Sequence, residues 1–125
     1  MLNVLYVGLG GFLGCTLRYG ANLLAPKLLG AQFPYATLFV NAIGAFLIGL
    51  IMTLGEPRVS AELWLFLVTG LLGGFTTFSA FSFETISLFS AGNYVAGLLN
   101  VLLNVCLSLG GAALGCAAAR LLLRV

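Results

Sequence analysis

Four long apolar runs, separated by short connectors, restrict this chain to very few folds. They cover residues 3–25, 34–54, 62–89 and 94–123. A helix that crosses a bilayer needs about 20 mostly apolar residues. Of the 125 residues 62% are hydrophobic and only 6% are charged, which is too few charges to cover a soluble domain. The sequence therefore predicts a single all-α transmembrane domain, residues 1–125, with four spanning helices.

The composition also excludes several classes of function. The net charge of +2 comes without a clustered basic face, so we expect no nucleic-acid partner. The chain has no histidine, which removes most general acid–base and zinc chemistry. Its three cysteines match no metal or redox spacing and are predicted to be small packing residues. The sequence therefore does not indicate an enzyme.

The third run contains a segment that a simple spanning helix does not need. Here Gly73 and Gly74 are followed by the β-branched residues Thr76 and Thr77. Glycine costs a helix interior about 1 kcal/mol relative to alanine, so this segment marks a place where the helix opens. Inside a membrane, opened backbone is tolerated only where it is buried in protein or lines a wet cavity, and its carbonyl groups can bind ions there. The sequence therefore predicts a broken third helix at an ion site.

The positive charges give almost no information on orientation. If the N-terminus is inside, Arg58, Arg120 and Arg124 lie on the inner side, whereas Arg18 and Lys27 lie on the outer side. Orientation follows the bias of lysine and arginine between the two sides, and here that bias is very weak. We therefore expect insertion both ways round, which permits an antiparallel homodimer. A single, weakly biased orientation is the alternative.

Uncharged polar side chains lie inside the predicted spans. Asn41, in the middle of the second run, must find a partner or face water, so it either forms an interhelical hydrogen bond or lines a path. Polar and small residues of the fourth run share one helical stripe: Gly97, Asn100 or Val101, Asn104, Ser108, Gly111 and Gly115. Uncharged donors suit a small anion that must shed water without being trapped, because conduction requires release.

Four other side chains have more than one reading. Phe78 and Phe81 share a helix face; such pairs usually pack, but the positive edges of aromatic rings also stabilise an anion. Arg18, near the end of the first run, is either an interfacial anchor or a cation that draws anions into a vestibule. Glu84 has three candidate roles: a proton carrier, a structural hydrogen-bond acceptor, or a residue that reaches toward the membrane surface. The residues alone do not decide between these roles.

Three segments together resemble the Fluc (CrcB) family of fluoride channels. They are GGFLGCTLRY at residues 10–19, PYATLFVNAIG at 34–44 and GLLGGFTTFSAFS at 70–82. Their order and separation extend the resemblance over essentially the whole chain. Two departures are Ala36, where the family usually has glycine, and Ala80, where threonine is common.

The resemblance implies a fluoride-selective channel that allows passive export of cytoplasmic fluoride. It implies a multi-pass protein of the cell (inner) membrane, in contact with lipid, and a dual-topology antiparallel homodimer. Each homodimer would contain two separate pores, and both subunits would contribute to each pore.

The resemblance also assigns roles to individual residues. It implies that the side chains along the fluoride path are those of Asn41, Phe78, Phe81, Ser79 and Ser108, with Thr77 as a weaker candidate. It implies a structural Na⁺ on the dimer axis, held by the backbone carbonyls of Gly73 and Thr76 from each subunit. Arg18 resembles the family's vestibule arginine, and Glu84 resembles its third-helix glutamate, whose role stays open.

Two other functions are alternatives to a fluoride channel. The first is a proton-coupled exporter of the small multidrug resistance type, also a short dual-topology dimer, which carries a glutamate in its first helix. The first run of this chain has no acidic residue. The second is a membrane subunit whose glycine stripes serve only assembly. The central Asn41 and the hydroxyl-rich segment near Thr76 disfavour this reading, because packing alone favours alanine and glycine.

Overall fold

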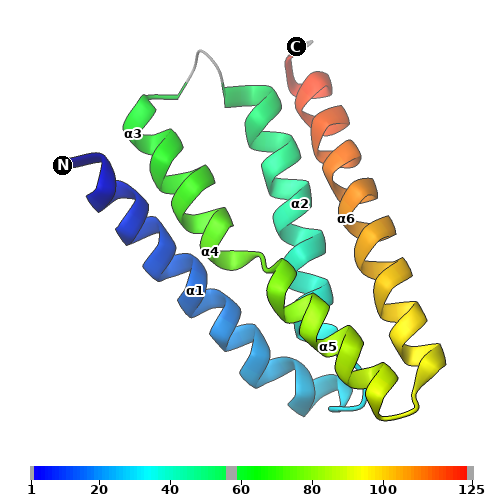
Figure 1. Cartoon of the computed structure of the whole chain (residues 1–125). Helices are drawn as coiled ribbons and strands as arrows, with labels where there is room; N and C mark the ends of the chain where they lie inside the picture. The colour runs from blue at the N-terminus through cyan, green and yellow to red at the C-terminus, as the bar shows by residue number, and fades with distance from the viewer. Residues whose placement is uncertain (1, 56–58, 124–125) are drawn as a thin grey trace.

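A computed structural model describes residues 2–55 and 59–123, and all regular structure in these ranges is helical (Figure 1). The chain runs up and down in a bundle, and the first turn of α1 lies at the same end as the last turn of α6 (Figure 1). The elements are α1 (Leu2–Leu29), α2 (Tyr35–Gly55), α3 (Ala61–Trp64), the π-helix η1 (Leu65–Leu72), α4 (Gly73–Phe75), α5 (Phe78–Ser90) and α6 (Tyr94–Leu123).

Three helical stretches of the described chain are long and apolar enough to cross a membrane. They are Tyr35–Gly55, Ala61–Ser90 and Tyr94–Leu123. α1 is not in this set, so a membrane crossing by residues 3–25 stays a prediction. The observed bounds of α2 and α6 agree with the predicted runs to within one residue.

The connector expected at Pro26 is not there, and α1 continues through it to Leu29. A proline inside a helix removes one hydrogen bond, because it has no backbone N–H. At Pro26 the missing N–H leaves only the carbonyl of Asn22 without its helical donor, and the Pro26 carbonyl still accepts a hydrogen bond from Gly30 N–H at 3.0 Å. Gly30 then ends the helix with a positive φ of 87°, a conformation that favours glycine.

The third apolar run opens at its two threonines. Thr76 (φ −82°, ψ 157°) and Thr77 (φ −154°, ψ 120°) are both extended, between α4 and α5. Gly73 and Gly74, which the sequence marked as the weak point, remain helical. A Cβ on Gly74 would lie 2.8 Å from the carbonyl oxygen of Gly11, so this glycine serves a close helix contact.

Small residues bring the helices together in two pairs. α1 packs on η1 and α4, while α2 packs on α6. A Cβ on Gly10 would overlap the carbonyl oxygen of Phe66, and one on Gly14 would overlap that of Leu71. Between α2 and α6, a Cβ on Gly49 would likewise overlap a backbone carbonyl oxygen. Because lipid tails are as apolar as the side chains, such close backbone packing is a main source of helix association in membranes.

We expect Gly14→Ala to destabilise the protein by about 1–3 kcal/mol, since a methyl group there forces α1 away from the third run. Gly8→Ala is the matched control on the same helix, because no atom lies within 4 Å of a Cβ at Gly8. Both changes raise helix propensity equally, so only packing differs. Thermal unfolding in detergent measures the difference, and equal midpoints for the two variants would contradict this packing.

Candidate functional site

The side chain of Asn41 on α2 holds the extended peptide at Thr77. Its Oδ1 accepts a hydrogen bond from the N–H of Thr77 at 2.8 Å, and its Nδ2 donates to the carbonyl of Thr77 at 3.1 Å. In a continuous helix that N–H would donate to the carbonyl of Gly73, four residues earlier. Asn41 therefore replaces the helical partner that the opened backbone loses, and Thr77 Oγ1 begins the next helix by accepting from Ala80 N–H.

A line of buried side chains continues from Asn41 across α6 to α5. Asn41 Nδ2 donates to Asn104 Oδ1 at 3.0 Å, and Asn104 Nδ2 donates to the backbone carbonyl and Oδ1 of Asn100 at 3.1 and 2.9 Å. Asn100 Nδ2 donates to Thr85 Oγ1 at 2.9 Å, and that hydroxyl donates to the carbonyl of Phe81 at 2.7 Å. Asn100 is fully buried. Three helices are thus joined by one hydrogen-bonded chain.

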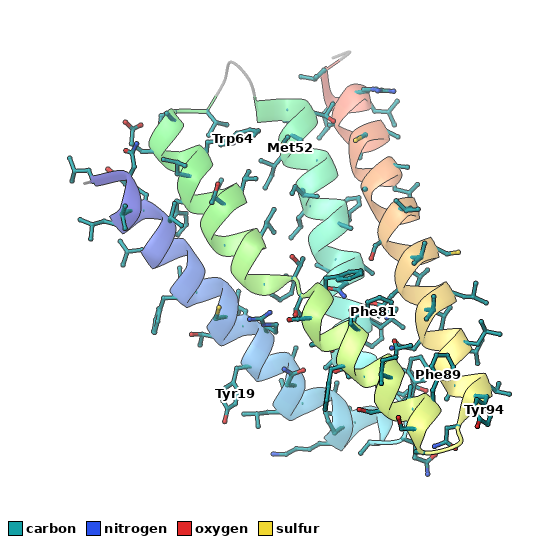
Figure 2. The ribbon with its side chains drawn as sticks, viewed as in Figure 1. Tyr19, Met52, Trp64, Phe81, Phe89 and Tyr94 are labelled. Carbon is teal, nitrogen blue, oxygen red and sulfur yellow. The ribbon has the colours of Figure 1, made fainter. Side chains whose placement is uncertain are left out.

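A cavity of about 480 Å³ lies where the opened backbone faces α2 and α6. None of the described residues that line it is charged. The rings of Phe78 and Phe81 stand beside it with centroids 5.3 Å apart and planes tilted by 56°. Phe81 projects into the bundle (Figure 2) and is 9% exposed, whereas Phe78 is 78% exposed. The polar side chains that line the cavity are those of Asn41, Thr76, Thr77, Asn104 and Ser108.

Most of the predicted path residues meet at this cavity. Asn41, Phe78, Phe81, Ser108 and Thr77 all line it. The exception is the exposed side chain of Ser79, which is not part of the lining and whose hydroxyl lies 3.2 Å from that of Thr77.

Arg18 reaches the opened backbone from α1. Its Nη1 donates to the carbonyl of Thr76 at 3.2 Å, and its Nη2 lies 3.7 Å from the sulfur of Cys15. The guanidinium therefore partners a carbonyl that the extended conformation has released from the helical ladder. Of the two readings from sequence, membrane-surface anchor or vestibule cation, neither included this contact.

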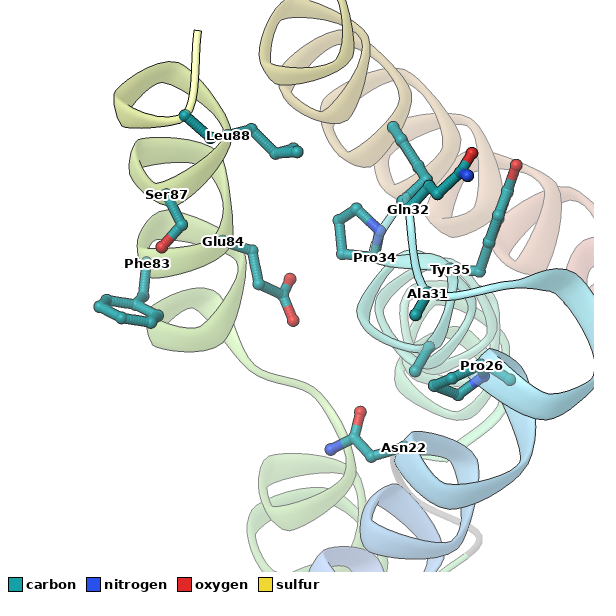
Figure 3. A pocket seen from close by; sticks show the side chains of 14 residues that line it. Asn22, Pro26, Ala31, Gln32, Pro34, Tyr35, Phe83, Glu84, Ser87 and Leu88 are labelled. Atoms are coloured by element: carbon teal, nitrogen blue, oxygen red, sulfur yellow. The ribbon is translucent and has the colours of Figure 1, made fainter. Parts of the chain in front are cut away.

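Glu84 lies at a second cavity, one helical turn farther along α5. Thr37 Oγ1 donates to Glu84 Oε1 at 2.7 Å, while Oε2 is buried and has no hydrogen-bond partner among the described residues. The carboxylate extends from α5 toward Pro34 and Ala31, which belong to the connector after α1 (Figure 3). Residues of α2 and of α5 line both cavities.

Comparison with known proteins identifies the family. A family model described as "CrcB-like protein, Camphor Resistance (CrcB)" matches residues 5–116. This chain belongs to the CrcB family. It is 48% identical to the fluoride-specific ion channel FluC of Clostridium perfringens over 98% of this chain and 97% of that protein.

Other members of the CrcB family show the same degree of similarity. The proteins of the same name from Ruminiclostridium cellulolyticum and a Roseiflexus species are 48% and 44% identical, over 92% and 97% of this chain and 90% and 99% of theirs. Together with the three membrane-length apolar helices, this membership makes the chain an integral membrane protein.

Four residues of this CrcB protein line the first cavity or join the hydrogen bonds beside the two cavities, in roles that the sequence does not predict. The sequence places Asn104 and Asn100 only on a polar stripe, and of the alternatives Asn100 and Val101 it is Asn100 that is buried. Thr85 and Thr37 were not singled out. Each of the two threonines lies four residues from a predicted path residue, so helical spacing was the available signal.

Some sequence expectations fall outside these sites. Arg58 and Arg124, which enter the count of charges on each side, lie outside the described residues. Among the described residues, Cys15, Cys106 and Cys116 are all free thiols.

We expect Asn41→Leu to lower the free energy of unfolding by about 2–4 kcal/mol. The change leaves both polar groups of the Thr77 peptide and Asn104 Oδ1 without their partner. Asn3→Leu, at an exposed asparagine near the start of α1, is the matched control. Unfolding of both variants in detergent measures the effect. A decrease in the free energy of unfolding below about 0.5 kcal/mol for Asn41→Leu would show that the hydrogen bonds of Asn41 add no more than an average interhelical hydrogen bond in a membrane.

Proposed function

We propose that this chain is the subunit of a fluoride-selective channel that lets cytoplasmic fluoride leave the cell passively across the cell (inner) membrane. Its membership of the CrcB family and the name of its relatives, which match nearly its whole length, support this proposal most strongly. The cavity at the helix interruption agrees with it, because its lining combines amides, hydroxyls and aromatic rings without a fixed charge. No step of catalysis is involved.

We further propose that fluoride moves past the Phe78 and Phe81 rings while neutral groups replace its water. The positive edges of the rings offer weak stabilisation, and the amide of Asn41 and the hydroxyl of Ser108 can donate hydrogen bonds. A central lysine or arginine would bind the anion too tightly for rapid release. Thr37 and Glu84, one turn along the same helices, would meet the ion next.

The working unit of this proposal is an antiparallel homodimer with four spans per subunit. Phe78 and Ser79, beside a break in an apolar helix, are exposed on a single copy, and irregular backbone at membrane depth needs a cover of protein or a wet cavity. A second copy provides that cover, and the broken third helix then lies within protein. The weak charge bias allows the two copies to insert oppositely, which gives two equivalent pores.

A structural Na⁺ on the axis of such a dimer fits the backbone at the break. The carbonyl of Gly73 has lost its helical donor to Asn41, and oxygen atoms of unwound helices are known Na⁺ ligands. The carbonyl of Thr76 already accepts from Arg18, and its second lone pair remains for a cation. Gly73 and Thr76 of both copies would hold the ion, which would tie the two breaks together.

A proton-coupled exporter of the small multidrug resistance type is not favoured. The described first helix, Leu2–Leu29, contains no acidic residue. The one carboxylate deep in the third run, Glu84, is hydrogen-bonded to Thr37.

We expect liposomes that contain the purified protein to release fluoride and to retain chloride. The release should need only valinomycin to balance charge, and it should be unaffected by collapse of a proton gradient, because the movement is passive. A fluoride electrode and a chloride electrode measure the two rates. A folded protein that releases no fluoride, or that requires a proton gradient, would contradict the proposed function.

Phe81→Ile serves as the variant control for that measurement. It keeps an apolar side chain of similar burial but removes the ring edge beside the cavity, so the fluoride rate should fall by at least about tenfold. An unchanged rate would assign the two rings to packing alone.

For the dimer, we expect roughly half of the copies to face each way in a cell membrane. With Cys15, Cys106 and Cys116 replaced by alanine and Ala91→Cys added in the exposed α5–α6 turn, an impermeant maleimide should label about half of the chains from outside. The remaining chains should label only after the membrane is opened.

The matched control adds Ser90→Lys to the same variant. A further positive charge in that turn should hold it on the cytoplasmic side and reduce the labelling from outside. Complete labelling, or none, in the parent variant would contradict dual topology.

A further inference from the structure

We propose that Asn100 and Thr85 are positioning residues for the fluoride path, although neither lines the cavity. This inference rests on the proposed function. The bond between them connects the two sides of the cavity, since Asn100 binds Asn104 on α6 and Thr85 binds the backbone of Phe81 on α5.

Fixed backbone groups determine how every amide in the chain points. The N–H of Thr77 can only donate, so the oxygen of Asn41 must face it and the nitrogen of Asn41 must face the carbonyl of Thr77 and Asn104 Oδ1. The nitrogen of Asn104 then faces the backbone carbonyl of Asn100, which can only accept. At the far end, the carbonyl of Phe81 can only accept, so the Thr85 hydroxyl donates to it and accepts from Asn100.

The hydrogen bonds consequently all run in one direction, from Asn41 through Asn104, Asn100 and Thr85 to Phe81. Each donor in such a chain is polarised by the bond that it accepts, so the members reinforce one another. An unpaired polar group in this dry interior is costly, and this cost keeps each amide from turning over. Asn100 is the central member, and it is 0% exposed.

This arrangement controls the groups that meet the ion. Both N–H bonds of Asn41 are already used, by Thr77 and by Asn104, so an anion must displace one of these acceptors to bind the amide. The side chain of Asn104 is the one that can move, and Asn100 holds it. On the other side, Thr85 and Asn100 fix the first turn of α5, from which the ring of Phe81 projects.

The experiment compares fluoride and chloride release per folded protein in liposomes for Asn100→Leu, Thr85→Val and Thr85→Ser. Asn100→Leu and Thr85→Val should each lower the fluoride rate by roughly tenfold, about the effect of one buried hydrogen bond, and should reduce the ratio of fluoride to chloride rates. Thr85→Ser keeps the hydroxyl and should retain both. A purely structural role would change the yield of folded protein and leave the ratio per folded protein unaltered.

Thr53→Val is the matched control for Thr85→Val. Thr53 Oγ1 also donates to the carbonyl four residues earlier, that of Gly49, at 2.9 Å, but it lies away from the cavity. Loss of this hydrogen bond should leave unchanged both the fluoride rate and the ratio of fluoride to chloride rates.

The double variant Asn100→Leu with Thr85→Val tests whether the two residues act through one bond. If they do, its rate should fall no further than that of the worse single variant. Independent, multiplied losses, or single variants within about twofold of the unaltered protein, would overturn the inference. If Asn100→Leu does not fold, the comparison of Thr85→Val with Thr85→Ser tests the inference by itself, and equal rates and ratios for these two variants would overturn it. Absence of fluoride release from the unaltered protein would instead count against the proposed function.

Discussion

The pairing of one side-chain amide with one opened peptide is the interaction on which this structure depends. A membrane helix can be interrupted only where its released N–H and C=O groups find other partners. Asn41 meets this demand at Thr77 because a carboxamide carries a donor and an acceptor side by side, and the N–H and C=O of one extended residue also point to the same side. Arg18 meets it at Thr76. The helix can open beside the cavity because these two residues give the released backbone groups new hydrogen-bond partners.

Close contact between backbones places those two residues where they are needed. Gly10 and Gly14 bring α1 against the third run, so that Arg18, one turn farther along α1, reaches the carbonyl of Thr76. Gly44 on α2 gives space to the methyl group of Thr76, which brings Asn41, less than one turn away, to Thr77. The small residues therefore act in both packing and site geometry. A larger residue at either point would separate the polar partner from the backbone that it satisfies.

The parts that could be predicted from the sequence are those governed by local chemistry. The lengths of the apolar runs predicted the bounds of α2 and α6. The glycines at 73 and 74 and the threonines at 76 and 77 predicted the region where the third run is interrupted. The sequence could not show that Gly74 would stay helical, or that α1 would run through Pro26, because both follow from what lies opposite in space. Thr85 and Asn100 were missed as a pair for the same reason: fifteen residues separate them in sequence, and only the α5–α6 turn makes them neighbours.

The saturated donors of the site also suggest why a small halide would be preferred. An ion that enters the cavity does not meet free N–H groups, since Asn41 and Asn104 already donate to protein acceptors. It must compete with a carbonyl or amide oxygen for the same hydrogen. The Coulomb attraction between an anion and a donor grows as their separation shrinks, so once both ions have lost their water the small fluoride ion competes better than the larger chloride ion. The same competition returns the hydrogen bond to the protein when the ion leaves, so a site of this kind combines discrimination with release.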